Sequence, residues 1–102
     1  MPIEDWAHTG GPAGTTLIGN SGTDIAVPNS GKKRRYLIIQ SPADAAGDVT
    51  IYMDQTGPAV AGQGIIISPG GYHEWTRNNI YWGPIFAVAP DGDVILSWHE
   101  GY

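Results

Sequence analysis

Short apolar runs separated by turn-forming residues occupy most of the chain. Residues Arg34–Ser41 contain Tyr, Leu and two Ile between turn formers, which is typical of a buried or half-buried β-strand. In the next run, Val49–Asp54, alternation places Val49 and Ile51 on one face of a strand. Because only the turn-rich residues 41–48 separate the two runs, we expect them to pair as a hairpin to which other strands add.

The rest of the chain repeats this pattern. Six further runs predict strands: Thr15–Gly19, Asp24–Val27, Gly64–Ser68, Tyr72–Arg77, Pro84–Ala89 and Asp93–Glu100. Turn formers at 20–22, 69–71 and 90–92 predict hairpins between neighbouring runs. Three consecutive isoleucines at 65–67 predict burial on both faces or a place in a sandwich core. Since no segment keeps a helical period, we expect an all-β fold, a single antiparallel β-sandwich or barrel of about eight short strands.

The chain length of 102 residues predicts one domain. Met1–Gly14 is rich in Gly and Pro, holds one large side chain, Trp6, and has neither helix nor strand periodicity. We therefore expect an extended N-terminal arm over residues 1–14 and a β-sandwich domain over residues 15–102. The arm is either a frayed tail or is anchored through Trp6, because a lone tryptophan supplies a large apolar area at low entropy cost.

The composition and charge exclude several classes of protein. The 41% apolar content is enough for a core, and the net charge of -5 disfavours general binding to nucleic acid, which needs a basic surface. The absence of cysteine excludes disulfides and thiolate metal sites. No apolar run follows the first residues, so no signal peptide is predicted, and no stretch is long enough to span a membrane.

Metal sites have weak candidates in the sequence. Residues 69–74 faintly resemble the first metal motif of a cupin through His73, but Trp75 stands where a second histidine is expected, which leaves only His99 as a partner. Residues 91–93 carry two aspartates, but core residues replace the later ligands of a calcium loop, and a turn explains them. We therefore expect no metal and no cofactor.

Catalytic groups are no better supported. Glu74 and Glu100 would form a glycosidase-like pair only if the sheet order brought them together, and the sequence does not fix that distance. No Ser–His–Asp set or nucleophile motif is recognisable. We expect a protein that is not an enzyme.

Four of the five Lys and Arg residues form one run, Lys32, Lys33, Arg34 and Arg35. The run is either a solvated segment that leads into the next strand and guards a sheet edge, or a docking patch for an acidic surface on a partner protein. Nucleic acid is a third and weaker partner, because the rest of the chain is acidic and would repel it.

An aromatic cluster is the second notable feature, since Tyr72, His73, Trp75, Tyr81 and Trp82 fall within eleven residues. Alternation places His73 and Trp75 on one face of their strand and Tyr72 on the other. Two interpretations stay open. Trp75 and Trp82 belong to the core with Tyr72 and Tyr81 half exposed, or the cluster forms a protein interface or a sugar-stacking platform.

The pattern as a whole resembles a known group of proteins. The segments that carry the resemblance are Arg34–Gln40, Asp48–Met53, Gly64–Trp75, Ile85–Ala89 and Asp93–Trp98. In strand order and turn chemistry they resemble small β-sandwich proteins encoded among tailed-bacteriophage virion genes, such as capsid decoration (cement) proteins and fibre or tail modules. Residues 32–100 carry the resemblance, and the arm falls outside it.

The resemblance implies a non-enzymatic virion structural protein, made in the host cytoplasm and placed on the particle surface. A decoration protein that binds and stabilises the shell is expected, usually as a homo-oligomer, with the major capsid protein or a neighbouring virion protein as its partner. The contact residues expected from the sequence are Trp6, Lys32, Lys33, Arg34, Arg35, Tyr72, Trp75, Tyr81 and Trp82. The alternatives are a carbohydrate-binding module of a host-recognition apparatus and a cupin-like metal-binding protein.

Overall fold

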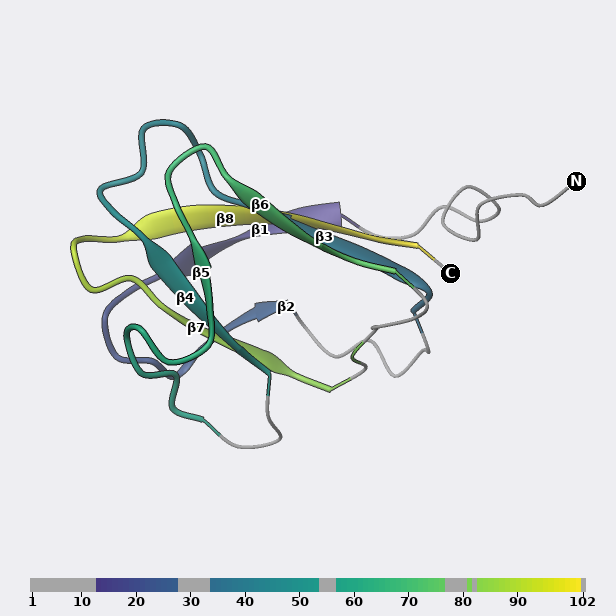
Figure 1. The fold of residues 1–102 in the computed structure, drawn as a ribbon, viewed down its shortest axis with the longest axis horizontal. Helices are drawn as coiled ribbons and strands as arrows, with labels where there is room; N and C mark the ends of the chain where they lie inside the picture. The colour runs from purple at the N-terminus through teal and green to yellow at the C-terminus, as the bar shows by residue number, and fades with distance from the viewer. Residues whose placement is uncertain (1–12, 28–33, 54–56, 77–80, 82, 102) are drawn as a thin grey trace, which may run out of the picture.

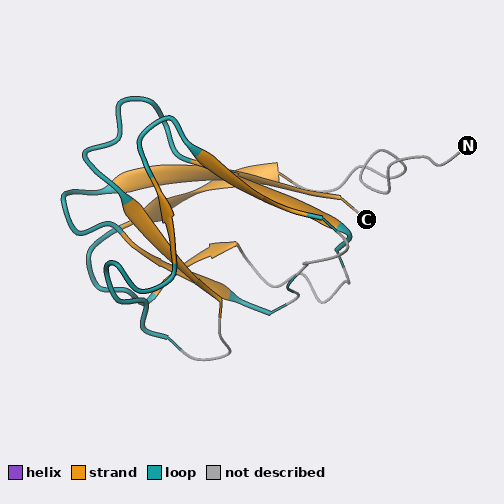
Figure 2. Ribbon diagram, in the orientation of Figure 1, coloured by secondary structure: helices purple, strands orange, loops and turns teal. Residues whose placement is uncertain are grey.

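The computed structural model confirms the all-β prediction. It describes residues 13–27, 34–53, 57–76, 81 and 83–101, and no helix occurs within them (Figure 2). These described residues form eight strands: β1 (Ala13–Ile18), β2 (Asp24–Val27), β3 (Tyr36–Gln40), β4 (Val49–Met53), β5 (Ile65–Ile67), β6 (Tyr72–Trp75), β7 (Ile85–Val88) and β8 (Val94–Gly101). Each lies within or close to a predicted run. Strand β1 begins at Ala13, so two residues assigned to the arm belong to the sandwich, and residues 1–12 lie outside the described part.

The strands form two antiparallel four-stranded sheets packed face to face (Figure 1). The first sheet has the order β1-β8-β3-β6, and the second has the order β2-β7-β4-β5. This is the strand order of a jelly roll, a double sheet built from two Greek keys. The fold is therefore a sandwich and not a closed barrel.

The strands lie where the sequence predicts them, but the predicted hairpin pairings between them are wrong. β3 pairs with β6 and β8, whereas β4 pairs with β5 and β7, so residues 41–48 carry the chain from one sheet to the other. The turns at 20–22, 69–71 and 90–92 also connect the two sheets. Among the eight strands only β4 and β5 are consecutive partners, because the same Gly, Pro and Asn chemistry serves a reversal within a sheet and a crossing between sheets.

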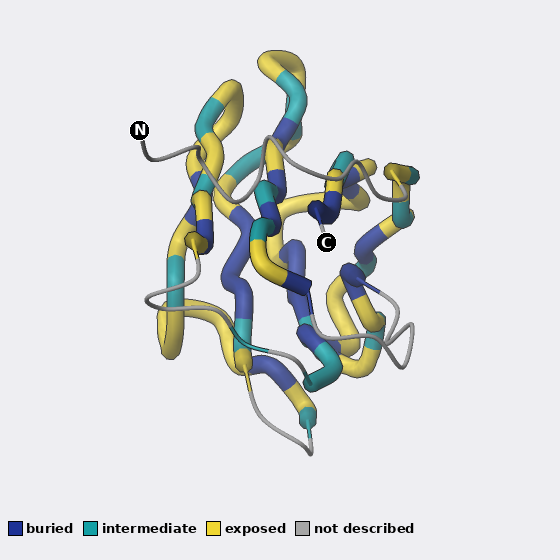
Figure 3. The backbone as a smooth tube through the Cα atoms, turned by 90° about the vertical axis from the view of Figure 1, so that its right-hand side faces the viewer, coloured by how far each residue is buried: buried dark blue, intermediate teal, exposed yellow. Residues whose placement is uncertain are grey.

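Alternation along the strands explains the core. Inward-facing side chains of both sheets meet between the layers, and buried segments gather in the middle of the molecule in Figure 3. Trp75 is the largest buried side chain, at 1% exposure, and its Nε1 lies 3.1 Å from the Sδ of Met53 on the opposite sheet. In the pairing of β1 with β8, Gly14 lies opposite Trp98 and leaves room for its indole, since a Cβ at Gly14 would lie 2.9 Å from that ring.

The isoleucines at 65–67 show how edge position changes burial. Ile67 is buried, but Ile66 is 51% exposed, so the expectation of burial on both faces is wrong. β5 is an edge strand of the second sheet, and its middle side chain points away from the core.

Candidate protein-interaction surface

The outer faces of the two sheets differ in how the chain covers them. Residues 57–64, which begin with the cis Gly57–Pro58 bond, lie over the outer face of the sheet β2-β7-β4-β5. Gly57 sits on the ring of Phe86, where a Cβ would approach to 2.8 Å, and the N–H of Gly62 donates to Thr50 Oγ1 at 3.0 Å. The N–H of Ala59 donates to the carbonyl of Gly22 at 2.8 Å. Residues 57–64 therefore cover the middle of this face, around Thr50 and Phe86, while Ile25 and Ile66 on its edge strands stay exposed.

No described segment is bonded in this way over the outer face of the sheet β1-β8-β3-β6. We call this surface the open face. Strand register arranges its side chains in rows across the four strands, because residues opposite each other in antiparallel strands share a face. The open face consists of Ala13, Thr15, Leu17, Tyr36, Ile38, Gln40, Tyr72, Glu74, Ile95, Ser97 and His99.

The open face exposes large apolar side chains. Leu17 is 59% exposed and lies opposite Ile95, which is 55% exposed. Tyr72 is 62% exposed and lies opposite Gln40, with half-buried Ile38 one row away. Apolar groups spread in this way over four strands exceed the scattered single residues that are normal on a soluble protein.

Charge is scarce on the same face. In a chain of net charge -5, its one carboxylate is Glu74, which accepts a hydrogen bond of 2.5 Å from the hydroxyl of Tyr36. Partial burial, helped by this bond and by the negative charge of Glu74, raises the pKa of Tyr36 from 10.0 to about 12. The phenol therefore stays neutral and bonded, and the face, with aromatic side chains and one carboxylate, has the low charge that is typical of the centre of a protein interface.

A cleft of about 590 Å³ opens at one end of the open face. Gln40, Ile95 and Ser97 of the open face form part of its wall, and Asp44 and Asp93 of the neighbouring loops complete it on the polar side. The loops β1–β2, β3–β4, β5–β6 and β7–β8, which cross between the sheets, gather at this end, on the left in Figure 1. All five aspartates that the structure describes lie in or beside these loops: Asp24, Asp44, Asp48, Asp91 and Asp93.

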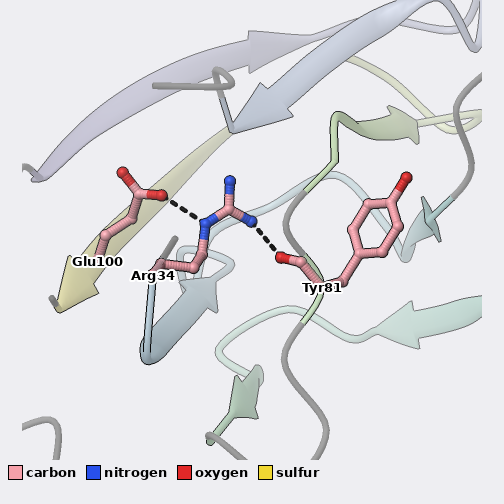
Figure 4. A network of polar contacts seen from close by, with 3 residues as sticks. All are labelled: Arg34, Tyr81 and Glu100. Carbon is pink, nitrogen blue, oxygen red and sulfur yellow. Dashed lines mark hydrogen bonds and ion pairs between the residues drawn. The ribbon is translucent and has the colours of Figure 1, made fainter. Parts of the chain in front are cut away.

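Arg34, expected in a basic docking patch, is buried at 1% exposure. Its Nε lies 2.6 Å from Glu100 Oε2, and its Nη1 donates to the carbonyl of Tyr81 at 2.7 Å (Figure 4). The first contact is not aligned as a hydrogen bond, so it is mainly the attraction of opposite charges. The expectation that Arg34 is a surface contact is therefore wrong, because its charge is used inside the sandwich.

The rest of the basic run is only partly described. Arg35 is exposed next to Arg34, and its N–H donates to the carbonyl of Gly101 at 2.8 Å, so its position is fixed by β8. Lys32 and Lys33 lie outside the described residues. A basic docking patch thus remains a prediction for Arg35 and the two lysines.

The aromatic cluster divides between core and surface. Trp75 is a core residue, and His73 lies edge-on to it with ring centroids 4.5 Å apart, which confirms that the two share a face. Tyr81 is half-buried and packs against the core. Tyr72 alone of the described members lies on the open face, so the sandwich core removes Trp75 from any surface platform. Trp82, like Trp6, lies outside the described residues.

The weak metal and carboxylate candidates are separated by the sheet. His73 faces the core, whereas His99 lies on the open face, so the two do not converge on one ion. Glu100 is buried against Arg34, whereas Glu74 lies on the open face. In the part of the chain that the structure describes, no three His, Asp or Glu side chains are grouped as metal ligands.

Sequence reasoning missed Leu17, Ile38 and Ile95 as surface residues. The alternation of residues 93–100 separates Ile95 from Val94 and Leu96, but it does not say which set faces the partner sheet. Which side of β8 is buried depends on the side of its sheet on which the partner sheet packs. The available signal was the neighbouring pair Ser97 and His99, whose polarity marks the outward side.

The comparisons with known proteins add no relative: no family model, no curated protein and no solved structure matches this chain. The described residues include no helix able to cross a membrane.

Proposed function

We propose that this chain is a non-enzymatic virion structural protein, a capsid decoration protein that binds a neighbouring protein through the open face. The observation that carries the proposal is the contrast between the two outer faces. Residues 57–64 cover the middle of one outer face, whereas no described residue covers the other, which exposes apolar side chains on several strands and carries one carboxylate. Burying such a face against a partner supplies the hydrophobic free energy of an interface.

The virion role rests on the resemblance and is compatible with the fold. Jelly rolls occur in viral capsid proteins, lectins and cupins, so the architecture by itself does not choose among these functions. Within that set the surface supports a protein partner such as the major capsid protein, because the open face is broad and carries little charge. The exposed Arg35, with Lys32 and Lys33 next to it in sequence, adds a positive segment for an acidic partner surface.

Particle binding tests the proposal. Particles purified after deletion of the gene are mixed with the purified chain, and co-sedimentation measures occupancy. We expect Leu17→Lys and Ile95→Lys to lower occupancy at least tenfold, because each places a charge in the proposed interface. Ile66→Lys is the matched control, since this residue is similarly exposed, at 51%, on the other sheet.

The outcome that contradicts the proposal is equal occupancy for the three variants at equal stability. Salt separates the two kinds of contact. Arg35→Ser should weaken binding at low ionic strength and have little effect at high ionic strength, because exposed charge pairs are screened. Arg34 is unsuitable for this test because it is a buried structural residue.

A carbohydrate-binding module is the second candidate, and one observation favours it. The exposed ring of Tyr72 lies opposite Gln40, which also lines the cleft beside Asp44 and Asp93. An aromatic ring next to a polar cleft is a plausible arrangement for a sugar, which stacks on the ring and hydrogen-bonds to the polar groups. A glycan array tests it: binding that disappears in Tyr72→Ala, with particle binding unchanged, would favour this function.

A further inference from the structure

The four sheet edges of the sandwich are protected to different degrees. β5 has only three residues, which offers little backbone to a new strand. β6 carries Glu74 and His73, and β2 has an irregular register between Ile25 and Val27. Short length, charge and bulges are the usual devices that prevent unwanted strand pairing.

β1 has none of these devices. Its six residues, Ala-Gly-Thr-Thr-Leu-Ile, include no charge and no proline. All six pair with β8 in one continuous register, from Ala13 opposite His99 to Ile18 opposite Val94. The result is an edge with regular register, in which alternate backbone N–H and C=O groups point away from β8.

The neighbouring edge of the other sheet is closed by β1 itself. Thr16 turns inward and its hydroxyl donates to the carbonyl of Ala26 in β2 at 2.9 Å. This bond occupies the carbonyl of Ala26 in β2, and it takes up no backbone group of β1 because only the side chain of Thr16 takes part. Within the described residues, no hydrogen bond to the outer edge of the β1 backbone is present.

Charge points to a particular occupant for this edge. The chain is acidic, so two copies repel each other wherever their carboxylates meet. β1 and the β8 residues that pair with it, Val94–His99, contain no carboxylate. A second copy therefore meets the least repulsion at β1, where it also finds unpaired backbone groups.

We propose that β1 adds to β1 of a second copy, which makes a continuous eight-stranded antiparallel sheet across a two-fold axis. The inference rests on the proposed assembly role and names the element through which copies join. A two-fold axis perpendicular to the sheet keeps both open faces on one side. Residues of the open face must then lie opposite residues of the open face.

This symmetry limits the register. With Thr15 opposite Thr15 of the second copy, residues 13–17 of both strands are paired, and Ala13 lies opposite Leu17. Each Leu17 then gains a neighbour on the side away from Ile95, which covers part of its exposed surface. The two open faces become one surface of twice the width.

A cysteine placed at the axis tests this register, because the natural chain has no cysteine. Residues directly opposite in an antiparallel pair have Cα atoms about 4.5–5.5 Å apart, which a disulfide can bridge. We expect Thr15→Cys to form a disulfide-linked dimer at least tenfold faster than Ile66→Cys under the same mild oxidant. Ile66 is the control because it is exposed on an edge strand of the other sheet.

Sedimentation of the unmodified full chain over a concentration series supplies the second measurement. One strand pair buries less than the roughly 1,200–2,000 Å² of a stable interface, so we expect a concentration-dependent dimer and not a permanent one. Thr15→Lys should shift the dissociation constant at least tenfold upward, because like charges face each other at the axis. Ile66→Lys should leave it unchanged.

Two results would overturn the inference: a chain that stays monomeric throughout the series, or Thr15→Cys that crosslinks no faster than Ile66→Cys. Its failure is distinct from failure of the proposed function. A monomer whose binding to particles still needs Ile95 contradicts only the β1 contact. A dimer that depends on Thr15 but binds no particle contradicts only the virion role.

Discussion

Replacing Arg34 with methionine is the sharpest test of the sandwich interior. The guanidinium is 1% exposed and holds Glu100 of β8 and the carbonyl of Tyr81 at once. Methionine fills a similar volume but leaves the Glu100 carboxylate buried without this cation. Breaking a buried ion pair by removing one partner costs about 3–5 kcal/mol, since the remaining charge is not compensated.

That magnitude is large compared with the stability of a domain of this size, which is about 5–15 kcal/mol. Urea unfolding followed by tryptophan fluorescence measures it, because the buried Trp75 reports on the core. With a slope of about 1–3 kcal/mol per molar urea, a loss of about 3–5 kcal/mol lowers the midpoint by about 1 M or more. Arg35→Met is the matched control and should change stability by no more than about 0.5 kcal/mol, as expected for an exposed residue.

The double variant Arg34→Met with Glu100→Leu separates charge from packing. Removing both charges should recover most of the loss, because well-packed apolar residues often replace a buried ion pair at little cost. The Tyr81 carbonyl still loses a donor, so a residual of about 1 kcal/mol remains. A loss below about 1 kcal/mol for Arg34→Met alone, the range of an exposed pair, would refute the buried position of this arginine.

Three further predictions concern turns, titration and the core. Gly22→Ala should destabilise the fold by about 2 kcal/mol more than Gly62→Ala in urea unfolding. Both glycines have a positive φ, +79° and +82°, but only at Gly22 would a Cβ meet a backbone oxygen, that of Ala59, at 2.2 Å. Stability that depends on neutral Tyr36 is complete below pH 10.0 and is lost as the pH rises toward about 12, so Tyr36→Phe should lose less over this window in thermal melts. Trp75→Ala should cost about 3–5 kcal/mol by the same urea assay, whereas a surface sugar platform at this position would leave stability almost unchanged.

Strand positions were predictable from local pattern, and pairing was not. Tyr36–Gln40 and Val49–Met53 lie inside their predicted runs, because apolar alternation and turn residues act over a few neighbours. The hairpin between them failed, because the choice between adjacent pairing and a crossing depends on how both sheets bury their faces. The predicted shared face of His73 and Trp75 was confirmed for the same local reason that the strands were.

The candidate surface was harder to predict than the fold. The sequence pointed to Tyr72 correctly as a surface aromatic, but it gave no sign that Arg34 would be internal, because its partner Glu100 is 66 positions later in the chain. The polar neighbours Ser97 and His99 indicate the outward side of Ile95, but the position of Ile95 opposite Leu17 follows from the pairing of β1 with β8. Long-range pairing of this kind is not encoded in a window of neighbouring residues.

The pairing of β1 with β8 also sets when the protein can fold. Because Ala13 lies opposite His99, β1 can pair with its neighbour in the sheet only after β8 has been synthesised. Contacts between distant parts of a chain are slow to form, which places such all-β topologies in the range of about milliseconds to seconds. Until β8 has been made, β1 has no partner within its own sheet, and unpaired apolar strands of this kind are the segments through which nascent chains aggregate.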